Sequence, residues 1–133
     1  MRILHPKGWA PTKGFSNGVA AEGRQVFVAG QIGWNAQQEI VSDDFVAQVD
    51  QALRNIVDIL AEAEARPEHL VRLTWYVTDK REYLARAREV GHAYQRVIGR
   101  HYPAMTLVQV AALLDERAKV EIESTAVVPA EHG

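Results

Sequence analysis

Two stretches with helical periodicity, each set between strand patterns, constrain the fold of this chain more than any other feature. Apolar residues recur at helical spacing over residues 43–65, and the helix is expected to stop before Pro67. The second helix is expected to begin after Asp79, which with Glu82 resembles a capping box, and to end near Gly99. The chain therefore needs a fold in which two helices pack on one sheet.

Strand patterns surround these helices. Alternating β-branched, aromatic and polar residues predict strands over 25–32, 70–78, 107–113 and 120–128, with a short strand within 15–20. The order is strands, helix, strand, helix and two strands, so each helix can serve as a crossover. Two helices cover one face of a mixed β-sheet most simply, which predicts an α+β sandwich.

The face of this sheet that the helices leave uncovered is only half polar. Apolar and charged side chains alternate onto it from the strands over 70–78 and 120–128, namely Arg72, Thr74, Tyr76, Glu121, Glu123 and Val127. Such a face suits a subunit interface with a wet cleft better than it suits bulk solvent. We therefore expect a homo-oligomer with its site between subunits.

Composition limits the remaining classes. A length of 133 residues favours a single domain over residues 1–133, and the net charge of −2 argues against a nucleic-acid binder. The chain has no cysteine and its five histidines lack metal-ligand spacing, so we expect no metal. No apolar run is long enough for a membrane span or a signal peptide, which predicts a cytoplasmic protein without a membrane partner.

Glu121 and Glu123 form the most suggestive pair of titratable residues. Period 2 puts both carboxylates on one strand face, roughly 7 Å apart between their Cα atoms, an arrangement that general acid–base chemistry can use. The alternative interpretation is structural: two glutamates that solvate a sheet edge, or that pair with Arg72 or Lys119. The residue pattern alone leaves both open.

Several short segments occur along the chain in a fixed order: Phe15-Ser16-Asn17, VFVAGQI at 26–32, Val71-Arg72-Leu73-Thr74, Tyr102-Pro103-Ala104 and VEIE at 120–123. Together they resemble the RidA/YjgF family of reactive-imine deaminases over essentially residues 15–128. The resemblance implies a chorismate-mutase-like (RidA-like) α+β fold and a homotrimer with three clefts between subunits. It also implies a reaction without a cofactor, in which water attacks the C=N carbon of an imine or enamine acid and ammonia leaves.

The resemblance also implies roles for individual residues. Glu121 matches the cleft glutamate that positions or deprotonates water, and Gly30 matches a glycine whose backbone borders the ligand. Phe15 lies near the place of a tyrosine in many members. The backbone N–H groups of Thr106 and Leu107 are expected to contact substrate, since their contribution does not depend on the side chain.

Met105 is the main departure from the family pattern. Deaminating members have an arginine there, which grips the substrate carboxylate through two parallel hydrogen bonds that methionine cannot make. The helix position that is asparagine in many active members is Gly91 here. The sequence therefore resembles an arginine-lacking branch of the family, and whether Arg72, Lys119 or His101 of a neighbouring subunit replaces the cation stays open.

These observations favour one function and leave two others open. The first is hydrolytic deamination of an imine, enamine or related C–N substrate other than small α-imino acids, with Met105, Phe15 and Trp34 as an apolar pocket. The second is a trimer that binds a small metabolite without turnover. The third, RNA cleavage, is disfavoured by the net charge and by the lack of a basic patch interleaved with aromatic residues.

Overall fold

The computed structural model describes residues 1–130, which form one main sheet layer and one helix layer. They follow the order β1 (Arg2–Leu4), β2 (Gly18–Ala20), β3 (Arg24–Gln31), α1 (Phe45–Glu62), the 3-10 turn η1 (Pro67–His69), β4 (Leu70–Val77), α2 (Lys80–Ala85), α3 (Ala87–Val97), β5 (Ala104–Gln109) and β6 (Val120–Val128).

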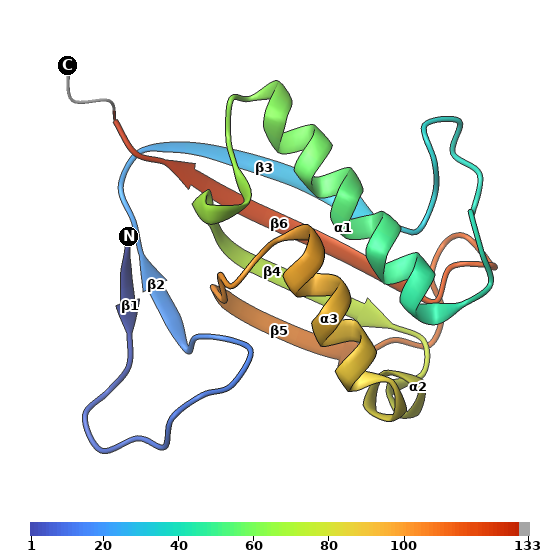
Figure 1. Cartoon of the computed structure of the whole chain (residues 1–133), viewed down its shortest axis with the longest axis horizontal. Helices are drawn as coiled ribbons and strands as arrows, with labels where there is room; N and C mark the ends of the chain where they lie inside the picture. Colours follow the sequence, from blue (N-terminus) through green and yellow to red (C-terminus); the bar gives the residue numbers. More distant parts are fainter. Residues whose placement is uncertain (131–133) are drawn as a thin grey trace.

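Four of the strands form a mixed sheet in the order β3-β6-β4-β5. β6 is antiparallel to both of its neighbours, and β4 is parallel to β5. The helices α1 and α3 lie side by side on one face of this sheet, so each connection between parallel strands crosses that face (Figure 1). The predicted α+β class, a mixed sheet with its helices on one face, is confirmed.

The core lies between the helix layer and the sheet. Its apolar residues on α1 recur at the predicted helical spacing and are fully buried: Val49, Ala52, Leu53, Ile56 and Leu60. They pack against alternate residues of β4 and β6, where Leu73, Val77, Val120 and Ile122 are equally buried. Residues 121 and 123 consequently project to the opposite face, as the alternation predicts.

The ends of the helices differ from prediction. α1 ends at Glu62 rather than near residue 65, because Glu64 adopts the left-handed conformation with φ of 56°. The second helical stretch is broken at Arg86 into α2 and α3, although Gly99 closes it in the expected left-handed conformation with φ of 95°.

Two strand predictions also need correction. β5 covers Ala104–Gln109 rather than residues 107–113, and the N-terminal segment forms a second, two-stranded sheet from β1 and β2. The long loop between β1 and β2 returns to the main sheet, where Ser16 forms an isolated bridge with Ala104 of β5. Within residues 1–130 no helix is both long and apolar enough to cross a bilayer.

Candidate functional site

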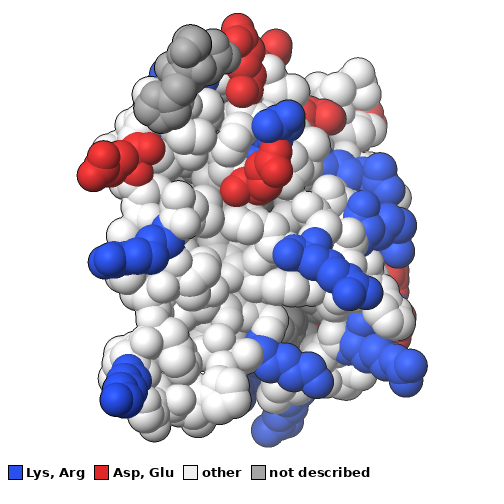
Figure 2. Space-filling model, turned by 60° about the vertical axis from the view of Figure 1, so that its left-hand side comes forward, with Lys and Arg blue, Asp and Glu red and all other residues white. Residues whose placement is uncertain are grey.

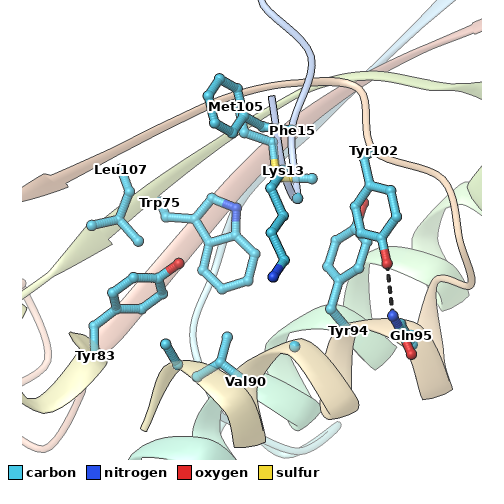
Figure 3. Close-up of a pocket in the computed structure, with 13 residues that line it drawn as sticks. Lys13, Phe15, Trp75, Tyr83, Val90, Tyr94, Gln95, Tyr102, Met105 and Leu107 are labelled. Atoms are coloured by element: carbon cyan, nitrogen blue, oxygen red, sulfur yellow. Dashed lines mark hydrogen bonds between the residues drawn. The ribbon is translucent and has the colours of Figure 1, made fainter. Parts of the chain in front are cut away.

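A cavity of about 650 Å³ opens between β5, α3 and the loop that follows β1 (Figure 3). Its walls are mainly aromatic and aliphatic, and it is lined by Lys13, Gly14, Phe15, Trp75, Tyr83, Ala87, Val90, Gly91, Tyr94, Gln95, Tyr102, Met105 and Leu107. Ligand pockets in proteins have this size and this apolar character. Three residues predicted for the site, Phe15, Met105 and Leu107, therefore share one cavity.

The loop residues of this cavity are fixed by backbone contacts with β5. Ser16 donates its N–H to the carbonyl of Pro103 at 3.0 Å and its hydroxyl to the carbonyl of Tyr102 at 2.6 Å. Gly14 has φ of 79°, a conformation that turns the chain just before Phe15. Ser16 therefore acts as the anchor that holds the preceding residues over the mouth of the cavity.

The alternation of β5 separates its predicted ligand-binding residues. Met105 and Leu107 pair in register with the buried Leu73 and Trp75, so their side chains face the helices. Thr106 pairs with Thr74, and its exposed side chain lies on the opposite face.

The backbone donors of β5 alternate too. The Pro103 carbonyl points outward to Ser16, whereas the Val110 N–H donates inward to Val77 at 2.8 Å. Alternation from either contact turns the Leu107 N–H to the open edge and the Thr106 N–H toward β4. Of these two predicted backbone donors, only the Leu107 N–H is free for a ligand.

Gly30 and Glu121 meet on the opposite face of the sheet. Glu121 lies over the Gly30 backbone so closely that an added Cβ would be 2.8 Å from its carboxyl carbon and 2.9 Å from its Cγ. A glycine is therefore required for this position of the carboxylate. Within residues 1–130 the Glu121 carboxylate forms no hydrogen bond and no ion pair.

Glu123, the other member of the pair, is occupied. The Tyr76 hydroxyl donates a hydrogen bond to its Oε1 at 2.5 Å, and this bond raises the pKa of Tyr76 above its usual value. Within residues 1–130 neither glutamate forms the alternative ion pair with Arg72 or Lys119, and Lys119 Nζ lies 3.8 Å from Glu82 instead. The two carboxylates thus differ: Glu123 accepts a hydrogen bond from Tyr76, whereas Glu121 remains available to a ligand.

The remaining predicted residues lie apart from the cavity. Trp34 follows β3, where its indole N–H donates to Gln31 at 3.4 Å and its carbonyl accepts from Asn55 at 2.9 Å. His101 hydrogen-bonds the carbonyl of Leu70 at 2.7 Å. Neither of these side chains lines the cavity.

Arg72, another candidate for the missing cation, lines a shallow hollow on the open face of the sheet, together with Phe27, Thr74 and Glu123. Phe27 is 72% exposed there. The described chain thus carries an apolar, partly charged open face, as the sequence analysis expects.

Sequence reasoning missed the aromatic walls and Lys13. Trp75 and Tyr94 belong to the buried core and also line the cavity, where their rings lie 6.4 Å apart. Tyr102 stacks on Tyr94 at 5.4 Å, and burial raises the pKa of Tyr83 and of Tyr94, so both keep neutral hydroxyls. Gly91 faces open space, which leaves the cavity wide at α3.

Comparisons with known proteins point to one family. The family model described as Endoribonuclease L-PSP matches residues 7–128. Protein DfrA of Myxococcus xanthus is 36% identical over 92% of this chain and 88% of its own length. The 2-iminobutanoate/2-iminopropanoate deaminase of Capra hircus is 32% identical over 78% of this chain and 73% of its own length. The crystal structure of YyfB, a Rid-family protein of unknown function from Yersinia pestis, superimposes with a TM-score of 0.85 at 32% identity, covering 96% of this chain and 98% of that one.

Proposed function

The chain belongs to the RidA/YjgF family that the Endoribonuclease L-PSP model describes, and on that premise we propose that it is a hydrolytic deaminase acting on an imine, enamine or related C–N substrate. The reaction takes place in a cleft between two subunits, and Glu121 handles the attacking water. The substrate is not a small α-imino acid, because Met105 stands where deaminating members carry an arginine.

The observation that carries this proposal is the contact between Glu121 and the Gly30 backbone. A carboxylate that lies half-buried beside a glycine, with no protein partner within residues 1–130, is free to bind a water molecule. Glu123 cannot do the same while it accepts the hydrogen bond from Tyr76. Glu121 is therefore the stronger candidate for the general base.

The positions of the predicted residues support assembly from two copies. Phe15, Met105 and Leu107 line the cavity on the helix side, whereas Gly30 and Glu121 lie on the far face of the same sheet. One site that contains all of them needs the cavity of one copy and the open face of the next. Contact between two different surfaces is heterologous, and it forms a closed ring when the rotation between copies closes, as in the homotrimer that the family resemblance implies.

The chemistry of such a cleft is cofactor-free. Water held by Glu121 attacks the carbon of the C=N bond, and its proton passes to the carboxylate. Glu121 then gives that proton to the nitrogen, which completes a tetrahedral carbinolamine. The hydroxyl proton of this intermediate passes through the same carboxylate to nitrogen while the C–N bond breaks, so that ammonia leaves and the carbonyl group forms. The outward N–H of Leu107 is placed to hydrogen-bond the substrate at the edge of β5.

One observation favours a second function, binding without turnover. The cavity walls are mainly aromatic and aliphatic, and the Met105 side chain offers neither charge nor donor at the position of the family arginine. A non-catalytic metabolite-binding trimer would show saturable ligand binding without ammonia release. RNA cleavage, which the family description names, is not the reaction we propose, given the net charge of −2.

Met105→Arg is expected to create activity on 2-iminopropionate. The substitution places a guanidinium in the cavity, where charge-assisted hydrogen bonds to the carboxylate favour binding by a factor on the order of 10²-fold or more. The measurement is ammonia release from 2-iminopropionate generated in situ, compared among wild type, Met105→Arg and the neutral control Met105→Leu. Wild type and the control are expected to release almost no ammonia.

Either of two results would contradict this prediction. Vigorous ammonia release by the wild-type protein from 2-iminopropionate would show that Met105 does not exclude small α-imino acids. A folded Met105→Arg variant as idle as the control would show that this position does not face the substrate.

A further inference from the structure

We propose that Lys13 supplies the cation of this cavity and that the natural substrate carries a carboxylate on a flat apolar group. The inference rests on the proposed function and names the substrate class for that site. It places the anion-binding charge on the loop after β1, away from the strand position that Met105 occupies.

Among residues 1–130, Lys13 is the only charged residue that lines the cavity. Figure 3 shows its side chain running inward from the loop, with the ammonium group between the rings of Trp75 and Tyr94. Lys13 is exposed, so it lines the mouth of the cavity rather than its floor, and no ion pair within residues 1–130 involves it. The cavity thus holds a positive charge that lacks a carboxylate partner in the described chain.

The indole nitrogen of Trp75 gives an independent indication of a missing acceptor. Trp75 is 5% exposed, and its Nε1 is buried without a hydrogen-bond partner within residues 1–130. A buried donor without a partner is unfavourable, so such groups in native proteins usually have an acceptor in the functional complex. Figure 3 shows the nitrogen side of the ring turned toward Lys13 and Met105, two residues that line the cavity.

The shape of the cavity indicates the rest of the ligand. Phe15, Tyr83, Tyr94 and Tyr102 provide aromatic walls, and Leu107 adds an aliphatic one. A volume of about 650 Å³ is in the range that holds ligands considerably larger than a three-carbon acid. Aromatic walls favour a planar apolar body, while the ammonium and the indole N–H both require an acceptor, which together describe an aryl or similarly flat carboxylate.

The surrounding surface has the matching charge. The side of the molecule that bears the loop after β1 faces the viewer in Figure 2, and the charged side chains over its lower half are almost all Lys or Arg. Acidic residues gather near the top of that view. A local positive field of this kind raises the concentration of anions at the mouth of the cavity, although the whole chain is slightly acidic.

The test uses phenylacetate as the probe and its neutral isostere phenylacetamide as the comparison ligand. Isothermal titration of the full chain is expected to show saturable binding of phenylacetate. Lys13→Met should weaken that binding by a factor on the order of 10- to 100-fold, because it removes one charge-assisted hydrogen bond. Lys13→Arg should retain most of the affinity, and Lys7→Met, a change to an exposed lysine of the same loop outside the cavity, should leave it unchanged.

A second readout locates the ligand. The three tryptophans give three indole N–H signals, and the Trp75 signal is expected to shift on addition of phenylacetate while those of Trp9 and Trp34 stay in place. The signals are assigned with Trp9→Phe and Trp34→Phe, which leave the cavity intact.

Three results would overturn the inference: no saturable binding to the wild-type protein, equal affinity for phenylacetate and phenylacetamide, or undiminished binding by Lys13→Met. The proposed hydrolysis is judged separately, because it is measured by ammonia release from imine substrates and not by phenylacetate binding. Lys13-dependent binding without any ammonia release from imine substrates would support the inference and count against hydrolysis. Ammonia release that depends on Glu121, without Lys13-dependent binding, would support hydrolysis and count against the inference.

Discussion

Glu121→Gln is expected to lower the rate of ammonia release by a factor on the order of 10²- to 10⁴-fold, the usual contribution of a general base. Glutamine has nearly the same shape, so it can keep the position over Gly30 that the carboxylate occupies. An amide oxygen, however, takes up a proton from water far less readily than a carboxylate does. The substitution should therefore lower the rate of turnover and leave folding unchanged.

Glu123→Gln is the matched control, because it makes the same chemical change two residues along the same strand face. Its carboxylate is engaged by Tyr76, so the substitution should alter turnover only slightly. The measurement is the rate of ammonia release from a panel of imines, with thermal unfolding as the check on structure. Equal rates for Glu121→Gln and wild type would remove Glu121 from the mechanism.

Gln48→Ala is expected to lower the free energy of unfolding by about 2–4 kcal/mol. Gln48 is fully buried on α1, and its amide makes three hydrogen bonds to backbone groups of two loops. It donates to the carbonyls of Ser42 at 2.9 Å and Arg117 at 3.0 Å, and it accepts from the N–H of Lys119 at 2.8 Å. Truncation leaves these backbone groups without their partner, and it also leaves a cavity.

These contacts matter for the site because Lys119 directly precedes β6, the strand that carries Glu121. Gln51→Ala is the control on the same helix, since the Gln51 amide donates only to Asn55, at 2.8 Å, and its loss should change stability by no more than about 0.5 kcal/mol. Urea denaturation measures both variants. Equal unfolding free energies for Gln48→Ala and Gln51→Ala would show that the buried amide does not stabilise the loops.

Elements governed by local alternation follow the sequence closely. β6 spans Val120–Val128 as predicted, because its buried residues alternate with partly or fully exposed ones from Val120 to Val127. α1 begins after Asp44, which accepts a hydrogen bond from the Ala47 N–H, as a capping aspartate should.

Deviations arise where contacts distant in sequence decide the structure. The helix break at Arg86 coincides with ion pairs of its guanidinium to Asp44 and Glu89, both at 2.7 Å, and the first of these joins segments that are far apart along the chain. β5 begins early because Ala104 is paired with Arg72 of β4 on one side and bridged to Ser16 on the other. Helical spacing carries no information about such pairings.

The candidate site was only partly predictable for the same reason. Gly30 and Glu121 come from recognisable strand segments, and the alternation of β6 puts Glu121 on the open face. Lys13 lies in a loop without regular structure, and its place in the cavity depends on the anchoring of Ser16 to Pro103. A pattern search along the sequence cannot register that contact.

The central claim, that two copies complete each site, is tested most directly by cross-linking a Phe15→Cys/Glu121→Cys double variant. The natural chain has no cysteine, so the two introduced thiols are the only targets for a short bis-maleimide. Within one chain the sheet separates these positions, and the proposed assembly would bring them to the same cleft. We predict covalent oligomers on a denaturing gel that neither single variant forms; a double variant that stays monomeric with both thiols modified would contradict the account.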